Sequence, residues 1–265
     1  MPYADVPGGR LWFDTTGEGP DVLLVHSGMS DSRMWDRHVG PLSERFRVIR
    51  TDLRFFGRSR TDEVPFSFSD DLAAVLDAAG VDGAAVVALS FGGRVALDFA
   101  LERPERVRAL VLASPGLTGR AFSPYDVERE AAVEKAFAAG DFDRSTALEL
   151  EVWAPLGATP EMRRLAVENA HVDSVEAEPA WPEPPTSDRL GEIGAPTLVL
   201  NGDRDVPGML EIGETLERQL PGARRIVLPG VDHFVPLRVP ERFVDEVIRF
   251  LAAPDPRSAS PASGR

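Results

Sequence analysis

The sequence predicts an α/β fold: a mostly parallel, doubly wound sheet with a helical cap inserted before the strand at 196–200. One observation is a set of short apolar runs, typical of strands buried on both faces, at 21–26, 84–89, 107–113 and 196–200. A second is that helical patterns alternate with these runs, as crossovers between parallel strands require. A third is that 265 residues with 43% hydrophobic content suffice for a sizeable core.

Strands and helices alternate regularly in the first half of the chain. Strands are predicted from alternating or continuous apolar patterns at 10–15, 21–26, 46–51, 84–89 and 107–113. Helices are predicted between them at 33–45, 70–79 and 91–102. Ser69 is the expected N-cap of the middle helix, and Gly80 is expected to end it.

The alternation stops after Gly116 and resumes at Pro196. The intervening segment has helical patterns at 125–139, 145–153 and 160–169 and a proline-rich stretch at 179–185. Beyond it we predict a strand at 196–200, a helix at 209–219, a strand at 225–228 and a helix at 240–252. The expected organisation is an α/β core of residues 1–116 and 190–253, a cap of residues 117–189 over the carboxyl ends of the strands, and a disordered tail of residues 254–265.

The composition disfavours several classes of partner. A formal net charge of −14 and a pI near 4.8 argue against nucleic acid and against an anionic membrane surface. The chain has no cysteine, which excludes disulfides, thiolate chemistry and cysteine-based metal sites. We expect no cofactor and no metal, a small and mostly apolar molecule as substrate, and a monomer or homodimer.

The location in the cell is predicted from what the N-terminal residues lack. Residues 1–5 show neither a basic region nor an apolar segment of the kind found in signal peptides. No apolar run approaches the roughly 20 residues that a membrane-spanning helix needs. We therefore expect a cytoplasmic protein.

Ser90 is the candidate nucleophile. It follows a buried strand directly, and a helix begins immediately after it, so the backbone must bend sharply at this residue. Side chains near such a bend must be small, and Ala88, Gly92 and Gly93 meet this need. The pattern resembles the G-x-S-x-G nucleophile elbow, with Ala88 in place of the first glycine.

His233 is the candidate base, because serine needs an adjacent base that is itself oriented by an acid. It lies in a loop after the strand at 225–228 and can reach back over the sheet edge. Of the other histidines, His38 and His171 are expected at the surface, and His26 is expected to brace a loop. Asp203 and Asp205 both follow the strand at 196–200, so either could accept a hydrogen bond from His233.

Together, the order Ser, acid, His and the surrounding loops resemble the α/β-hydrolase fold superfamily over nearly the whole chain. The resemblance selects Asp205, the third residue after Gly202, as the acid of a Ser90–Asp205–His233 triad. It implies that the backbone N–H groups of Gly28 and Phe91 form an oxyanion hole. Three residues depart from the family pattern: Ser27 in the loop after the second strand, Ala88 in the elbow, and Phe55 where glycine is usual.

The resemblance is nearest to small bacterial esterases, enol-lactonases and carbon–carbon bond hydrolases. The leading hypothesis is hydrolysis of a carboxylic ester or lactone through an acyl-enzyme on Ser90. The alternatives are carbon–carbon bond hydrolysis with the same residues, and a non-hydrolytic lyase, cyclase or ligand-binding protein. The expected substrate contacts are Met29, Phe55 and Trp153; further cap aromatics that could line the pocket are Phe122, Phe137, Phe142 and Trp181.

Overall fold

A single nine-stranded sheet organises the computed structural model, which describes residues 3–120 and 127–253. Its spatial order is β1-β2-β4-β3-β6-β7-β8-β9, with β5 paired to β2. The strands are β1 (Tyr3–Val6), β2 (Gly9–Thr16), β3 (Asp21–Val25), β4 (Arg47–Thr51), β5 (Arg60–Thr61), β6 (Ala84–Leu89), β7 (Val107–Ala113), β8 (Thr197–Gly202) and β9 (Arg224–Leu228). All pairings from β4 to β9 are parallel, and those of β2 are antiparallel. The predicted fold class is confirmed.

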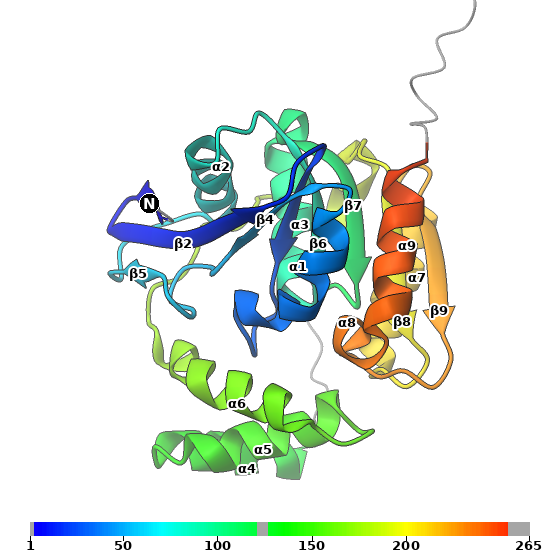
Figure 1. Ribbon diagram of the computed structural model, residues 1–265. Coiled ribbons are helices and arrows are strands. Elements are labelled where there is room, and N and C mark those ends of the chain that lie inside the picture. The colour runs from blue at the N-terminus through cyan, green and yellow to red at the C-terminus, as the bar shows by residue number, and fades with distance from the viewer. Residues whose placement is uncertain (1–2, 121–126, 254–265) are drawn as a thin grey trace, which may run out of the picture.

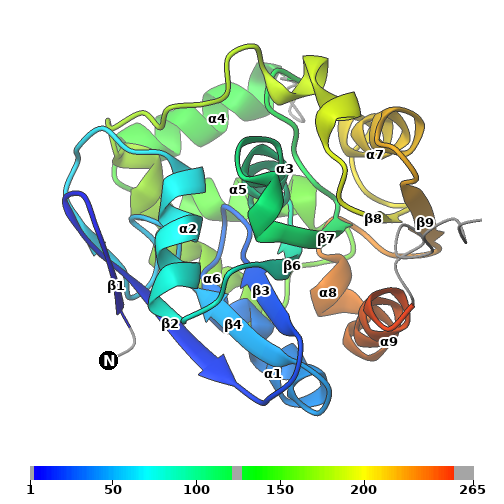
Figure 2. The ribbon, with the colours of Figure 1, turned by 90° about the horizontal axis from the view of Figure 1, so that it is seen from above.

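Helices cover both faces of this sheet, as Figure 2 shows from above. The core helices are α1 (Asp36–Ser43), α2 (Phe68–Ala78), α3 (Phe91–Glu102), α7 (Pro207–Gln219), α8 (Val235–Arg238) and α9 (Pro240–Leu251). Strand β3 shows why its apolar run is continuous: Leu23 and Val25 pack with α2, α3 and α7, whereas Val22 and Leu24 pack with α1 and α9. Both faces of the strand are therefore withdrawn from water, which is the main stabilising contribution to such a sheet.

Three further helices lie between β7 and β8 in the chain: α4 (Val127–Ala138), α5 (Phe142–Trp153) and α6 (Pro160–Asn169). We call these helices and the short turns after them the helical insert. Figure 1 shows them as a layer below the sheet, on the side toward which the arrowheads of β7 and β9 point. Short 3₁₀ turns complete the described chain: Ser32–Trp35, Pro104–Arg106, Ala170–Ser174, Thr186–Asp188 and Leu190–Glu192. The insert thus lies at the carboxyl ends of the parallel strands, where ligands bind in folds of this class.

Two local predictions were wrong. Helix α2 begins at Phe68, and its N-cap is Ser67, whose hydroxyl accepts hydrogen bonds from the next turn; Ser69 lies inside the helix. The helix expected at 33–45 is divided into a 3₁₀ turn and α1, which ends at Ser43. The predicted tail of residues 254–265 lies outside the described residues. No helix in the described part of the chain is long and apolar enough to cross a bilayer.

Candidate active site

Ser90 occupies a strained turn between β6 and α3. Its backbone angles are φ 55° and ψ −116°, a region that costs about 1–3 kcal/mol for a residue with a side chain. The strain is held in place by hydrogen bonds: the Ser90 N–H donates to Ala113 (3.0 Å), and its carbonyl accepts from Arg94 (3.1 Å) and Gly116 (3.0 Å). The bend presents Ser90 at the carboxyl end of β6, and its side chain is only half-buried.

The small residues of this turn are required by close packing. A Cβ atom on Gly92 would overlap the carbonyl oxygen of His26 and lie 2.7 Å from that of Val25. A Cβ on Gly93 would lie 2.6 Å from Cβ of Pro115. Ala88, in the place of the first glycine, is fully buried inside β6. The structure accepts a methyl group at Ala88, and it leaves no such room at the two glycines.

His233 and Asp205 are brought together by the loops that follow β9 and β8. Nδ1 of His233 lies 3.1 Å and 3.2 Å from the two carboxylate oxygens of Asp205. Both residues are buried, at 3% and 7% exposed. The two loops approach closely because residue 202 is glycine, where a Cβ would overlap the Val231 carbonyl oxygen. A carboxylate in this position holds the Nδ1–H tautomer and leaves Nε2 available as a base.

The neighbouring carboxylates serve the loops instead. Asp203 accepts a hydrogen bond from the backbone N–H of Gly230 at 2.7 Å. Asp232 is fully buried and pairs with Arg238 at 2.6 Å, while also accepting from the N–H of Phe234. Of the two acids that the sequence left open by position alone, Asp205 is the one hydrogen-bonded to His233.

Aromatic rings flank the imidazole of His233. The ring of Trp153, the last residue of α5, lies 4.5 Å away between centroids, and that of Phe234 lies 5.6 Å away. The helical insert therefore contributes a side chain directly against the candidate base. Met29, the other apolar contact expected here, is half-buried and packs on the same face of the sheet as α1 and α9.

The other aromatic candidates of the insert separate into two groups. Trp181 lies 5.7 Å from Phe68 and 6.3 Å from Phe91 between ring centroids, next to the elbow. Phe137 and Phe142 pack on each other at 5.4 Å, at the turn between α4 and α5. Phe122 lies outside the described residues.

Gly28 and Phe91, the expected oxyanion donors, lie side by side. A Cβ on Gly28 would be 3.4 Å from Cβ of Phe91, which is ordinary van der Waals contact. The loop after β3 is thereby held against the first residue of α3. The expected oxyanion hole needs the N–H groups of both residues to donate to the same carbonyl oxygen, so it depends on this position of the loop.

His26 braces the loops as expected. Its Nδ1 lies 2.8 Å from the carbonyl oxygen of Ser27, and its Nε2 accepts the N–H of Leu53 at 2.9 Å. Burial lowers the pKa of this imidazole, which is consistent with a neutral ring that donates on one side and accepts on the other. The ring joins the loop after β3 to the loop after β4.

His38 was expected at the surface, and this prediction was wrong. The residue is fully buried against Trp35 and Phe243, with Nε2 at 3.1 Å from the Pro236 carbonyl oxygen. Burial lowers its pKa to about 4. The reason is tertiary, because helix α9 covers the face of α1 that carries His38. His171, as expected, is exposed.

Phe55 has a positive φ of 73°, which explains why glycine would be the easier residue there. Its ring packs against Phe66 at 5.6 Å between centroids, and its carbonyl oxygen lies 3.1 Å from Nε2 of His171. The conformation is thus held by contacts on both sides. Phe55 is positioned by the core and by the helical insert together.

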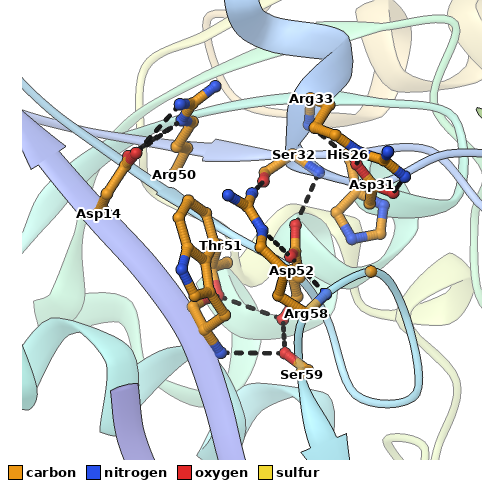
Figure 3. Close-up of polar contacts among 12 residues, drawn as sticks. Asp14, His26, Asp31, Ser32, Arg33, Arg50, Thr51, Asp52, Arg58 and Ser59 are labelled. Carbon is orange, nitrogen blue, oxygen red and sulfur yellow. Dashed lines mark hydrogen bonds and ion pairs between the residues drawn. The ribbon is translucent and has the colours of Figure 1, made fainter. Parts of the chain in front are cut away.

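A buried polar network fastens the loops after β3 and β4, as Figure 3 shows. Asp52 accepts the N–H of Ser32 at 2.9 Å and the N–H of Arg58 at 2.8 Å. Asp31 accepts from the Arg33 side chain. Asp31 carries no sequence signal beyond its place before a short helical turn. Within residues 3–120 and 127–253, no group of three or more His, Asp or Glu side chains could hold a metal ion.

Comparison with known proteins places these features in a family. Residues 20–238 match the family model of the alpha/beta hydrolase fold. The chain is 29% identical over 248 residues to a pimeloyl-(acyl-carrier protein) methyl ester esterase of Nitrosomonas europaea, covering 88% of this chain and 96% of that protein. It is 31% identical over 271 residues to a 2-hydroxy-6-oxo-6-phenylhexa-2,4-dienoate hydrolase of Burkholderia cepacia, covering 92% and 91%.

A solved structure agrees with these relatives. Est816, described as an N-acyl homoserine lactone degrading enzyme, superposes with a TM-score of 0.75 at 28% identity, covering 94% of this chain and 100% of that chain. The similarity therefore extends over the sheet, the strand ends that carry Ser90, Asp205 and His233, and the helical insert. This chain belongs to the α/β-hydrolase fold family.

Proposed function

We propose that this protein hydrolyses carboxylic esters or lactones through an acyl-enzyme on Ser90. The observation that carries the proposal is the strained Ser90 turn at the same sheet edge as the buried His233–Asp205 pair. The esterase relative and the lactone-degrading structure support this choice of bond. The aromatic rings of Trp153 and Phe234, which flank the imidazole of His233, favour an apolar acyl group.

In the first half-reaction, Oγ of Ser90 attacks the carbonyl carbon while Nε2 of His233 takes the hydroxyl proton. The carbonyl oxygen becomes an oxyanion that the N–H groups of Gly28 and Phe91 stabilise. The tetrahedral adduct then collapses, and the leaving alkoxide takes the proton from His233. In a lactone the same bond breaks, but the alcohol stays attached to the acyl group.

In the second half-reaction, water replaces the alcohol. His233 removes a proton from this water, which attacks the acyl carbon, and the second adduct releases the carboxylic acid as Ser90 recovers its proton. Asp205 stays ionised throughout and stabilises the imidazolium that forms twice in each cycle. The helical insert acts as a cap whose Trp153 side keeps bulk water from the imidazole.

The test is turnover of p-nitrophenyl acetate and butyrate, combined with covalent labelling by a fluorophosphonate. The wild type should release p-nitrophenol and gain one label, whereas Ser90→Ala should lose both. Ser114→Ala is a matched control, because Ser114 is a buried serine with a positive φ of 41° at the end of the neighbouring strand β7. Labelling that persists in Ser90→Ala, or is lost equally in Ser114→Ala, would refute the proposal.

A second candidate is carbon–carbon bond hydrolysis, favoured by the 31% identity to the dienoate hydrolase. The two reactions differ in the bond that water cleaves, so their substrates separate them. Turnover of a 2-hydroxy-6-oxo-dienoate at a kcat/KM well above that of p-nitrophenyl butyrate would favour the second candidate. The reverse ratio supports ester or lactone cleavage.

A further inference from the structure

Asn169, the last residue of α6, bonds to two loops of the core at once. Its Nδ2 donates to Oδ2 of Asp31 at 3.0 Å, and its Oδ1 accepts the N–H of Gly57 at 3.0 Å. Nδ2 also donates to the Leu165 carbonyl at 2.8 Å, within its own helix. Because a carboxylate only accepts and a backbone N–H only donates, the orientation of this amide is determined by its partners. The side chain is buried, at 2% exposed.

Two neighbours of Asn169 contact the same loops. Glu168 forms an ion pair with Arg33 at 2.6 Å, and Nε2 of His171 lies 3.1 Å from the carbonyl oxygen of Phe55. We call residues 168–171 the docking segment. Through it, the helical insert contacts the loop after β3, the loop after β4 and the 3₁₀ turn at Ser32–Trp35.

The partner of Asn169 in the β3 loop is a buried anion. Burial by itself raises the pKa of the Asp31 carboxyl, but the hydrogen bonds from Arg33 and Asn169 outweigh it, and the pKa lies below its usual range. Asp31 is fully buried, so each of its hydrogen-bond donors matters for keeping the charge there. Loss of the Asn169 donor from the helical insert would therefore destabilise the buried charge of Asp31.

The loop that ends at Asp31 is short and tightly bonded. The hydroxyl groups of Ser27 and Ser30 lie 2.9 Å apart, and the N–H of Ser30 donates to the Ser27 carbonyl at 3.3 Å. Gly28, which faces Phe91, lies between these two serines. A loop closed by such bonds moves as a unit, so a displacement at Asp31 reaches Gly28 three residues earlier.

We propose that Asn169 is a positioning residue for the oxyanion hole. Through Asp31 and Gly57 it holds the β3 loop where the Gly28 N–H can serve the oxyanion, so the hole is complete only when the helical insert is seated on the core. The inference rests on the proposed function of Ser90 and adds to it. A catalytic geometry set from the insert would couple its seating on the core to the chemical step.

The test compares Asn169→Asp, which is isosteric, with Asn169→Ala. The aspartate keeps an acceptor for Gly57 but turns an oxygen toward Asp31 and the Leu165 carbonyl. Both variants should lower kcat for p-nitrophenyl butyrate about 10- to 100-fold, as for a weakened oxyanion donor, with KM changed by less than about threefold. The rate of fluorophosphonate labelling should fall by a similar factor, since phosphonylation uses the same hole.

Glu168→Gln is the matched control. It removes the Arg33 ion pair from the docking segment, but its side chain is 43% exposed and does not bond to Asp31 or Gly57. Its kcat should stay within about threefold of the wild type, because exposed ion pairs contribute little. Thermal unfolding of each variant identifies any loss of folded protein at the assay temperature.

Several outcomes would overturn the proposal. If the folded Asn169 variants keep the wild-type kcat, Asn169 is only structural, even if their melting temperature falls. A raised KM with unchanged kcat would make Asn169 a substrate-binding residue. An equal loss of kcat in Glu168→Gln would show that the effect is not specific to Asn169. These results require an active wild type. A wild type without turnover or labelling would instead refute the proposed function, and the positioning role with it.

Discussion

Nδ1 of His233 lies 3.1 Å from Oδ1 and 3.2 Å from Oδ2 of Asp205, although the two residues belong to loops after different strands. The carboxylate thereby faces the imidazole with both oxygens, while Oδ1 also accepts the N–H of Val206 at 2.8 Å. The side chain of Asp205 is held from two directions. Replacing Asp205 by asparagine therefore removes the negative charge beside His233 and alters the tautomer of its imidazole, while the shape of side chain 205 changes little.

Asp205→Asn is expected to lower kcat by about 10³- to 10⁴-fold with a nearly unchanged fold, because an amide can donate to Nδ1 and so favour the wrong tautomer. Esterase turnover under saturating substrate measures this. Asp203→Asn is the control: its amide oxygen can still accept the Gly230 N–H, so kcat should stay within about threefold. Similar losses in both variants would contradict the assignment of Asp205.

Gly92→Ala is expected to destabilise the protein by about 2–3 kcal/mol or more. The added Cβ would lie 2.7 Å from the Val25 carbonyl oxygen and overlap that of His26, and backbone atoms cannot move aside cheaply. Urea unfolding measures the loss as a lower midpoint. Gly40→Ala is the matched control in helix α1, where a Cβ would meet nothing within 4 Å, so a gain of about 0.5–1 kcal/mol is expected. An equal midpoint for Gly92→Ala and the wild type would show that the turn is not tightly packed.

Trp153→Ala is expected to lower kcat/KM for p-nitrophenyl butyrate about tenfold or more. Its ring lies 4.5 Å from that of His233 between centroids. Removing it would admit water beside the imidazole and weaken the electrostatic attraction between His233 and Asp205. Trp153→Phe should stay within about threefold, because it keeps an aromatic ring there. Phe137→Ala removes an aromatic ring from the same insert away from His233 and should have little effect. A comparable loss in Phe137→Ala would assign the effect to the stability of the insert.

Asp98 joins the two ends of the helical insert to helix α3. Its buried carboxylate accepts hydrogen bonds from the hydroxyl groups of Thr118, which precedes helix α4, at 2.7 Å and of Thr186, which follows helix α6, at 2.5 Å. Burial raises its pKa to about 6, against the opposing effect of these hydrogen bonds and of Arg94; Glu102 adds to the rise. The folded state therefore binds the Asp98 proton more tightly than the unfolded state, whose pKa is about 4.

Between about pH 4 and pH 6 the folded state holds more protons, so the contribution of Asp98 to the free energy of unfolding falls as pH rises. The total change is about 3 kcal/mol for a shift of about two pKa units. The free energy of unfolding of Asp98→Asn minus that of the wild type should therefore rise by about 3 kcal/mol between about pH 4 and pH 6, and should stay constant above pH 6. Urea unfolding at several pH values checks this, and a difference independent of pH would contradict the raised pKa.

Local sequence patterns predicted much of this molecule because they report local physics. Continuous apolar runs such as 84–89 indicate strands buried on both faces, and a serine between such a run and a glycine-rich helix start indicates a strained turn. The N-cap error at Ser69 is of the same local kind, since Ser67 and Ser69 both suit the position. The burial of His38 could not be predicted, because the pattern of one helix does not reveal that α9 lies over it.

By itself, the sequence determined the fold class, the order of strands and helices, and the strand ends at which Ser90, Asp205 and His233 occur. These depend on hydrophobic periodicity and on glycine and proline at turns, which act over a few residues. Only the tertiary structure decided that the ring of Trp153 packs against the imidazole of His233, and that Asn169 bonds to Asp31 across 138 residues of chain. Such pairs form when separately folded segments pack on one another, and nothing in the sequence near either partner encodes that meeting.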